Sequence, residues 1–265
     1  MLSIILFTSF AVFLLIGTPI AICLGMSSIF TIIADAGTRP LDTVMSVVPM
    51  LVSSSSSKFV LLAIPFFILS GNIMEKAGIS TKLIKFAQSF VGHINGGLAL
   101  VCVLVACFFA AISGSGPATV AALGGIIIPA MTSVGYSKGD ASALMATAGG
   151  IGIIIPPSIP MVVIAGICGI STGKLFLGGI IPGVLCGLAQ MIVSYFMAKK
   201  EGVPKEPGHF TIGPVLHGLW ESWPALLMPI IIVGTITMGI VSPTEAGVIA
   251  VVYGLFAGGI IYREL

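Results

Sequence analysis

Two interrupted apolar stretches decide how this chain is built. Residues 108–122 read FFAAISGSGPATVAA, and residues 148–160 read AGGIGIIIPPSIP. Glycine and serine lead up to Pro117 in the first stretch, and three prolines fall within five positions of the second. Neither stretch can continue as one helix, because proline lacks the backbone N–H and clashes with the preceding turn. Two clustered breaks in apolar segments are the pattern of a secondary transporter's midplane site.

The composition around these stretches is that of a membrane protein. Of the 265 residues, 57% are hydrophobic and 8% are charged, too little polar surface to cover a water-soluble globule of this size. The sequence also contains five long ranges without a charged residue, and each reaches the roughly 20 residues that a helix needs to cross the hydrocarbon. These ranges, which leave His93 uncounted, are 1–34, 86–137, 141–173, 175–198 and 222–244. We therefore expect an all-α polytopic membrane protein.

Helix-breaking and polar residues predict the boundaries near the N-terminus. Pro19 lies in the middle of the apolar range 2–34, which therefore forms either two short spans or one long kinked span. The polar connection that follows contains five consecutive serines, at 53–57. Such a run is typical of a flexible loop.

Two segments have the pattern of helices that lie in the membrane interface. Residues 75–95 carry three lysines and place apolar residues at helical spacing on one face, as a basic amphipathic helix does. Residues 211–223 end in a stretch with Trp220 and Trp223, and tryptophan is enriched at the headgroup level. A span over 224–241 is expected to follow this second segment.

The range 97–135 has the pattern of a re-entrant hairpin. Its two apolar limbs are short of a full span and meet at the polar, glycine-rich tip 113–117. A hairpin returns to its starting side, which fits two cytoplasmic loops marked by lysines. Two full spans would satisfy the same parity. The lysines of these loops are Lys76, Lys82, Lys85, Lys199, Lys200 and Lys205.

The breaks suggest a particular chemistry. Inside hydrocarbon an unpaired carbonyl or amide is costly unless protein or a wet cavity surrounds it. Unwound carbonyls and serine hydroxyls form an oxygen cage suited to a cation such as Na⁺, whereas a helix N-terminus, as near Pro117, attracts anions. The alternative is that the glycines only allow close helix packing and the prolines only kink.

Several other classes of protein do not fit the sequence. A net charge of +2 gives no electrostatic footprint for nucleic acid. The five cysteines lie in apolar segments without metal-ligand spacing. An intramembrane serine hydrolase would need a base beside Ser113 or Ser115, but His93, His209 and His217 fall in polar or interfacial stretches. We expect no enzyme activity; a pore or a purely structural subunit stays open.

These motifs resemble a known family. The stretch 108–122 is similar to the first hairpin, and 148–160 to the broken helix, of the DctM-like large membrane subunit of TRAP transporters. The segment 242–246, SPTEA, resembles the start of the helix that opens that family's second half. The family belongs to the ion-transporter superfamily of elevator-type carriers. The resemblance therefore implies an elevator-type transporter half with a re-entrant helical hairpin and a broken transmembrane helix.

The resemblance also implies a function. It is that of a Na⁺-coupled importer of small organic anions such as C4-dicarboxylates or sialic acid. A periplasmic substrate-binding protein and a small four-helix membrane subunit would be its partners, in the bacterial inner (cytoplasmic) membrane. The alternatives are another carrier of the superfamily or a non-transporting structural subunit or fragment. Na⁺ as coupling ion is expected in place of any cofactor or resident metal.

The expected site lies where the tip meets the break. The resemblance maps the Na⁺ ligands to Ser113, Ser115, Gly149, Gly150 and Gly152. Family members often have a hydroxyl residue where this chain has Gly116, so Ser113 is the firmer of the two serine ligands. Substrate contacts are expected along the same two segments, at Gly114, Gly116, Pro117, Thr119, Pro156, Pro157 and Ser158.

The same resemblance divides the chain into expected parts. They are 1–57 with N-terminal scaffold helices and a loop; 58–96 with a span and the interfacial amphipathic helix; 97–171 with the transport-domain hairpin (97–135) and broken helix (140–171); 172–241 with scaffold helices; and 242–265 at the start of a second inverted repeat. A complete carrier of this kind has two repeats. We therefore expect a truncated chain that inserts in the membrane but does not transport by itself.

Overall fold

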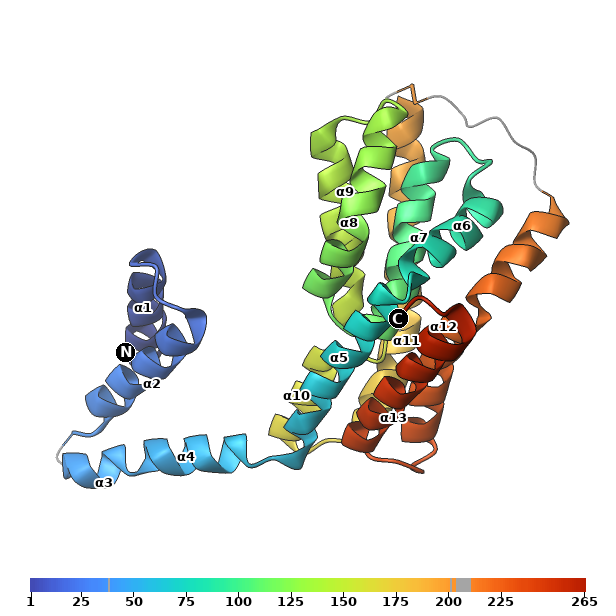
Figure 1. Cartoon of the computed structure of the whole chain (residues 1–265). Helices are drawn as coiled ribbons and strands as arrows, with labels where there is room; N and C mark the ends of the chain where they lie inside the picture. Colours follow the sequence, from blue (N-terminus) through green and yellow to red (C-terminus); the bar gives the residue numbers. More distant parts are fainter. Residues whose placement is uncertain (38, 201, 204–210) are drawn as a thin grey trace. The chain divides into compact units, whose positions relative to one another are not determined.

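The computed structural model describes residues 1–37, 39–200, 202–203 and 211–265. Over these residues the protein is all-α, with no β-strand. Lys205 and His209 lie outside the described residues. Within this described part of the chain, five helices are long and apolar enough to cross a membrane: Phe59–Lys76, Gly116–Ser133, Thr172–Lys200, Ile212–Thr237 and Pro243–Tyr262. The expected all-α polytopic membrane fold is confirmed (Figure 1).

The chain forms two compact units, Met1–Lys58 and Phe59–Leu265. In the first, α1 (Leu2–Leu15) and α2 (Ile20–Asp35) pack on each other. Gly17, at φ +84°, turns the chain between them, a conformation that costs glycine little. The rings of Phe13 and Phe30 stack at 5.8 Å. The range 2–34 is therefore two short helices rather than one kinked helix.

The serine run is helical, so the expected flexible loop at 53–57 is wrong. After α3 (Leu41–Met45), α4 (Val47–Ser56) contains most of the run. Serine hydroxyls bond carbonyls of the preceding turn: Ser54 donates to Leu51 O at 3.1 Å and Ser57 to Ser53 O at 2.7 Å. These two hydroxyls are thus satisfied without breaking the helix.

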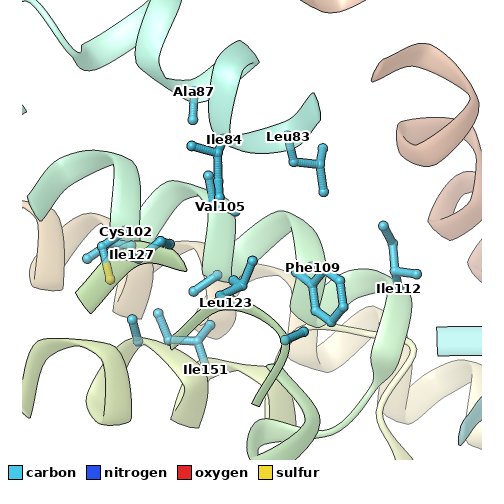
Figure 2. Close-up of a cluster of buried hydrophobic side chains, with 14 of the residues drawn as sticks. Leu83, Ile84, Ala87, Cys102, Val105, Phe109, Ile112, Leu123, Ile127 and Ile151 are labelled. Carbon is cyan, nitrogen blue, oxygen red and sulfur yellow. The ribbon is translucent and has the colours of Figure 1, made fainter. Parts of the chain in front are cut away.

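In the second unit α7 (Gly97–Ser113) is the central helix. It packs against α5 (Ala63–Lys76), α6 (Ile79–Val91), α8 (Gly116–Ser133), α9 (Lys138–Gly150), α11 (Thr172–Lys200) and α12 (Ile212–Thr237). Figure 2 shows Phe109 of α7 between residues of these neighbours, among them Leu123 of α8 and Leu83 of α6. The remaining elements are the short helices η1 (Phe59–Leu62) and η2 (Ile151–Ile153), then α10 (Ile159–Cys168), α13 (Pro243–Phe256) and η3 (Ala257–Tyr262).

The expected amphipathic helix over 75–95 corresponds to α6. Ile79 and Leu83 are buried, and they belong to the face that packs on α7 and α12. Phe90, on the same expected apolar face, is 50% exposed. Most of this face therefore contacts protein, and its position in a membrane interface stays a prediction.

The expected boundary between an interfacial segment at 211–223 and a span at 224–241 is wrong, because α12 continues through both as one helix. The position of 211–223 in a membrane interface stays a prediction. Pro224 and Pro229 lie inside this helix. Membrane helices tolerate proline, although each proline leaves the carbonyl four residues earlier without its helical donor. Tyr253 of α13 donates a hydrogen bond to Pro224 O at 2.7 Å and so ties α13 to this part of α12. Trp220 is 76% exposed, as a headgroup-facing tryptophan would be.

The start of α7, the link between α8 and α9 and the end of α11 lie together, as expected if all three are on the same side of the membrane. A Cβ added to Gly96, before α7, would touch Ala198 near the end of α11 and would lie 3.2 Å from Tyr136 Oη. Tyr136 lies between α8 and α9. The α7–α8 hairpin therefore returns to its starting end, as expected. The limbs have 17 and 18 residues. The expectation that both limbs are short of a full span is wrong for α8, which is long and apolar enough to cross a membrane.

The last spanning helix begins with a capping box. Ser242 Oγ accepts from Glu245 N at 3.3 Å, and Ser242 N donates to Glu245 Oε2 at 2.7 Å. Thr244 instead donates its hydroxyl to Phe59 O at 3.0 Å. Glu245 is thus a first-turn residue that stabilises the start of α13.

Replacing Ser242 by alanine should lower the free energy of unfolding by about 1 kcal/mol, because the first turn of α13 loses its side-chain acceptor. Thermal unfolding of the purified chain in detergent measures this loss. Ser54→Ala is the matched control, since that hydroxyl bonds only its own helix. Equal losses in the two variants would contradict the role of the cap.

Candidate functional site

The hairpin tip is built from a left-handed glycine and a serine cap. α7 ends at Ser113 and is capped by Gly114, whose φ is +62°, a conformation that favours glycine. Ser115 is the N-cap of α8, and its Oγ accepts from Ala118 N at 3.4 Å. Pro117 follows within the first turn, where its missing N–H costs nothing. The chain thus reverses direction in the three residues between Ser113 and Pro117.

Three oxygen atoms converge inside this tip. Thr119 Oγ1 donates to Ser115 O at 2.9 Å and lies 3.1 Å from Ser113 Oγ. Ser113 Oγ is 3.3 Å from the same carbonyl. Ser113 and Thr119 are both buried. The sequence placed Thr119 among the substrate contacts, but the structure brings it beside the expected ion ligand Ser113.

The second break has the same local design. α9 ends at Gly150, η2 follows, and α10 begins after Ser158. Ser158 caps α10 by accepting from Met161 N at 3.4 Å and donates its own proton to Ile153 O at 2.8 Å. Both capped helices begin Ser-x-Pro, at 115–117 and 158–160. The pattern combines the favoured N-cap serine with a proline in the first turn.

The tip and the break touch through backbone atoms. Ile159 N, the first amide of α10, donates to Gly114 O at 3.0 Å. A Cβ on Gly114 would lie 2.7 Å from Pro157 O, and one on Gly116 would lie 3.0 Å from Gly149 O. One on Gly152 would lie 3.1 Å from Gly116 N. Side chains at these glycines would separate the two segments.

Most of the expected site residues are brought together, with two exceptions. Gly150 is exposed, and a Cβ on it would have nothing within 4 Å. Pro117 is also exposed, whereas Pro156, Pro157 and Ser158 are buried. Gly150 therefore faces away from the tip, while Gly149 and Gly152 face it.

One residue that the sequence analysis missed supports the tip from behind. A Cβ on Gly71 of α5 would lie 3.3 Å from Ser113 Cα, so glycine lets α5 approach the end of α7 closely. Its only signal in the sequence is a glycine within an apolar span. Packing against a distant segment cannot be read from that.

The site is uncharged. The tip and the break contribute hydroxyls, carbonyls and amides. Among the residues that the structure describes, no group of three or more His, Cys, Asp or Glu side chains could hold a metal ion. Neutral oxygens suit a monovalent cation better than a transition metal.

An all-α membrane protein with a helical hairpin and a broken helix that meet at their interruptions has the form of a secondary transporter. The family model described as "Tripartite ATP-independent periplasmic transporter, DctM component" matches residues 7–265. The chain belongs to this DctM family. Members are transport proteins rather than enzymes, as expected.

Individual relatives agree with the family assignment. The chain is 46% identical over 261 residues to an isethionate TRAP transporter permease, DctMQ, of Oleidesulfovibrio alaskensis, covering 98% of the chain and 40% of the relative. It is 42% identical over 254 residues to the C4-dicarboxylate TRAP transporter large permease DctM of Vibrio cholerae, covering 95% and 54%. The chain thus spans about half the length of the curated relatives it matches.

Gly152→Ala should weaken the contact between break and tip, because its Cβ would press on the backbone of Ser115 and Gly116. We expect a loss of roughly 1–3 kcal/mol, typical of overpacking. Gly150→Ala is the matched control and should be neutral or stabilising. Thermal unfolding of the two variants compares them, and equal stability would contradict the close approach.

Proposed function

We propose that this chain forms part of the large membrane subunit of a Na⁺-coupled, binding-protein-dependent transporter that imports small organic anions. The observation that carries the proposal is the direct meeting of tip and break, with Ile159 N 3.0 Å from Gly114 O. Two interruptions that satisfy each other's backbone form a fixed polar site between apolar helices. A purely structural subunit would not need two interrupted helices that meet at their ends.

Na⁺ coupling is supported by the oxygens of the tip. Ser113 Oγ, Thr119 Oγ1 and Ser115 O lie within 3.3 Å of one another. Uncharged oxygens in a buried site can replace the water shell of a monovalent cation. Carbonyls of Gly149 and Gly152 belong to the proposed ligand set because both residues pack against the tip.

An anionic substrate is supported by the helix ends. The N-termini of α8 and α10 meet at the site, and helix N-termini carry partial positive charge. Isethionate and C4-dicarboxylates, named for the relatives above, are small organic anions. Other relatives are named for 2,3-diketo-L-gulonate and for sialic acid. Among these anions, we propose C4-dicarboxylates as the substrate class of the transporter that contains this chain.

The partners and the membrane follow from the same family. We propose a small four-helix membrane subunit, a periplasmic substrate-binding protein and the bacterial inner membrane. Lysines in the last turns of α5 and α11 and within α6 support a cytoplasmic side for these segments under the positive-inside rule. Residues 97–171 would form the moving part of an elevator-type carrier, with a re-entrant hairpin at 97–135.

Ser113→Ala should weaken the Na⁺ dependence of uptake in the reconstituted transporter that contains this chain. A ligand lost from a dry site costs roughly 1–3 kcal/mol, which corresponds to about a 5- to 150-fold rise in the Na⁺ concentration for half-maximal uptake. Ser133→Ala is the control, since that exposed hydroxyl bonds its own helix.

Na⁺ titrations of radiolabelled succinate uptake measure the effect. An unchanged Na⁺ response in Ser113→Ala, at equal protein yield, would remove Ser113 from the site. Uptake that needs no cation gradient in the unaltered transporter would overturn Na⁺ coupling itself.

The hairpin should stop inside the membrane. In a background with the five native cysteines replaced by alanine, Pro117→Cys at the exposed start of α8 should react slowly with a membrane-impermeant thiol reagent. Ser171→Cys, in the loop between α10 and α11, is the reference for a fully accessible loop. Equal rates for both positions in every condition would favour two full spans.

A further inference from the structure

α11 also packs directly against the break. Three glycines at four-residue spacing, Gly179, Gly183 and Gly187, form one face of this helix. A Cβ on Gly179 would lie 2.7 Å from Ile154 O, and one on Gly183 would lie 3.4 Å from Ile155 Cα. One on Gly187 would lie 2.9 Å from Cys107 Sγ of α7. Small residues thus let α11 lie directly against the unwound segment.

The unwinding leaves one carbonyl of α9 without its helical donor. In a regular helix Ile151 N would donate to Thr147 O. Here the amides at the end of α9 bond the carbonyls three residues back instead: Ile151 N donates to Ala148 O and Gly152 N to Gly149 O. Gln190 of α11 takes the vacant place, with Nε2 donating to Thr147 O at 3.0 Å. Gln190 follows Gly187 by three residues and therefore continues the same face.

The carboxamide of Gln190 has no competing use among the described residues. It lines a cavity of 390 Å³ between α9 and α11. The cavity's two hydroxyls already serve their own helices, since Thr147 Oγ1 donates to Ala143 O at 3.0 Å and Ser194 Oγ to Gln190 O at 2.7 Å. Gln190 Oε1 is buried and has no hydrogen-bond partner within the described part of the chain. Burying the carboxamide oxygen without a partner costs free energy. The hydrogen bond from Gln190 Nε2 to Thr147 O offsets this cost.

We propose that Gln190 is a positioning residue for the ion site, which fixes the point where α9 unwinds by holding the Thr147 carbonyl. Without this donor, Thr147 O is satisfied most simply by restoring its bond from Ile151 N. That change rewinds the start of η2 and displaces Gly152, which lies against Gly116 of the tip. Gln190 thus acts on the site through the backbone of 149–152, without touching the ion.

The assignment to an ion site rests on the proposed function, so the test needs a readout that does not depend on transport. Gly150→Cys supplies it, because position 150 is exposed and a Cβ there meets nothing within 4 Å. In the cysteine-free background, labelling of this cysteine in purified, lipid-reconstituted chain reports the conformation of the break. Ser171→Cys, labelled in parallel, reports unfolding of the chain as a whole.

Gln190→Leu should change the labelling rate at position 150 roughly three- to tenfold, as expected for the loss of one hydrogen bond, and leave position 171 unchanged. Gln190→Glu keeps the side-chain length but replaces the donor nitrogen by a carboxylate oxygen, which only accepts hydrogen bonds when it is ionised. It should therefore shift the labelling rate at position 150 in the same direction. Ser194→Ala is the matched control in the same cavity and should leave both rates unchanged. In the reconstituted transporter, Gln190→Leu should raise the Na⁺ concentration for half-maximal uptake while the maximal rate changes less.

The outcomes separate the two proposals. Unaltered labelling at position 150 in both Gln190 variants would overturn the positioning role, whatever the transporter does. An equal change at positions 150 and 171 would also overturn it, since the effect would then be general unfolding. A shift at 150 in a transporter that ignores Na⁺ would support Gln190 as the anchor of the break and refute only Na⁺ coupling.

Discussion

The hydrogen bond from Ile159 N to Gly114 O is the interaction on which the arrangement of this protein depends. Hydrocarbon offers no water to satisfy a broken helix, so each interruption needs a partner within the protein. Here the first amide of α10 donates a hydrogen bond to the carbonyl of Gly114, the residue that caps α7. The two interruptions are tolerated because they lie against each other.

Glycine makes this contact geometrically possible. Gly114, Gly116 and Gly152 lie where a Cβ would meet the opposite backbone within about 3 Å. Gly71 and Gly179 perform the same role for the helices that back the tip and the break. In a membrane, where the hydrophobic effect between helices is weak, such close backbone approach is a main source of helix association. The high glycine content, 34 residues, thus has a local explanation at these positions.

Much of this could be predicted from the sequence, because proline and long charge-free ranges act locally. The hairpin tip and the break at 148–160 follow from residues whose effects extend over one turn. The serine run was misjudged because hydroxyls can bond their own helix as readily as leave it. The continuity of α12 through Pro224 depends on neighbouring helices, which one sequence does not show. The roles of Gly71 and Gln190 were not predicted for the same reason, since each depends on contact with a residue far away in the sequence.

The central claim is that tip and break together hold a monovalent cation. Cryo-electron microscopy of the reconstituted transporter, in sodium chloride and in choline chloride, tests it most directly. The account predicts density in sodium alone, bounded by Ser113 Oγ, Ser115 O and the backbone of Gly149 and Gly152. Identical, mutually hydrogen-bonded Ser113 and Thr119 hydroxyls in both salts, with no density between tip and break, would contradict it.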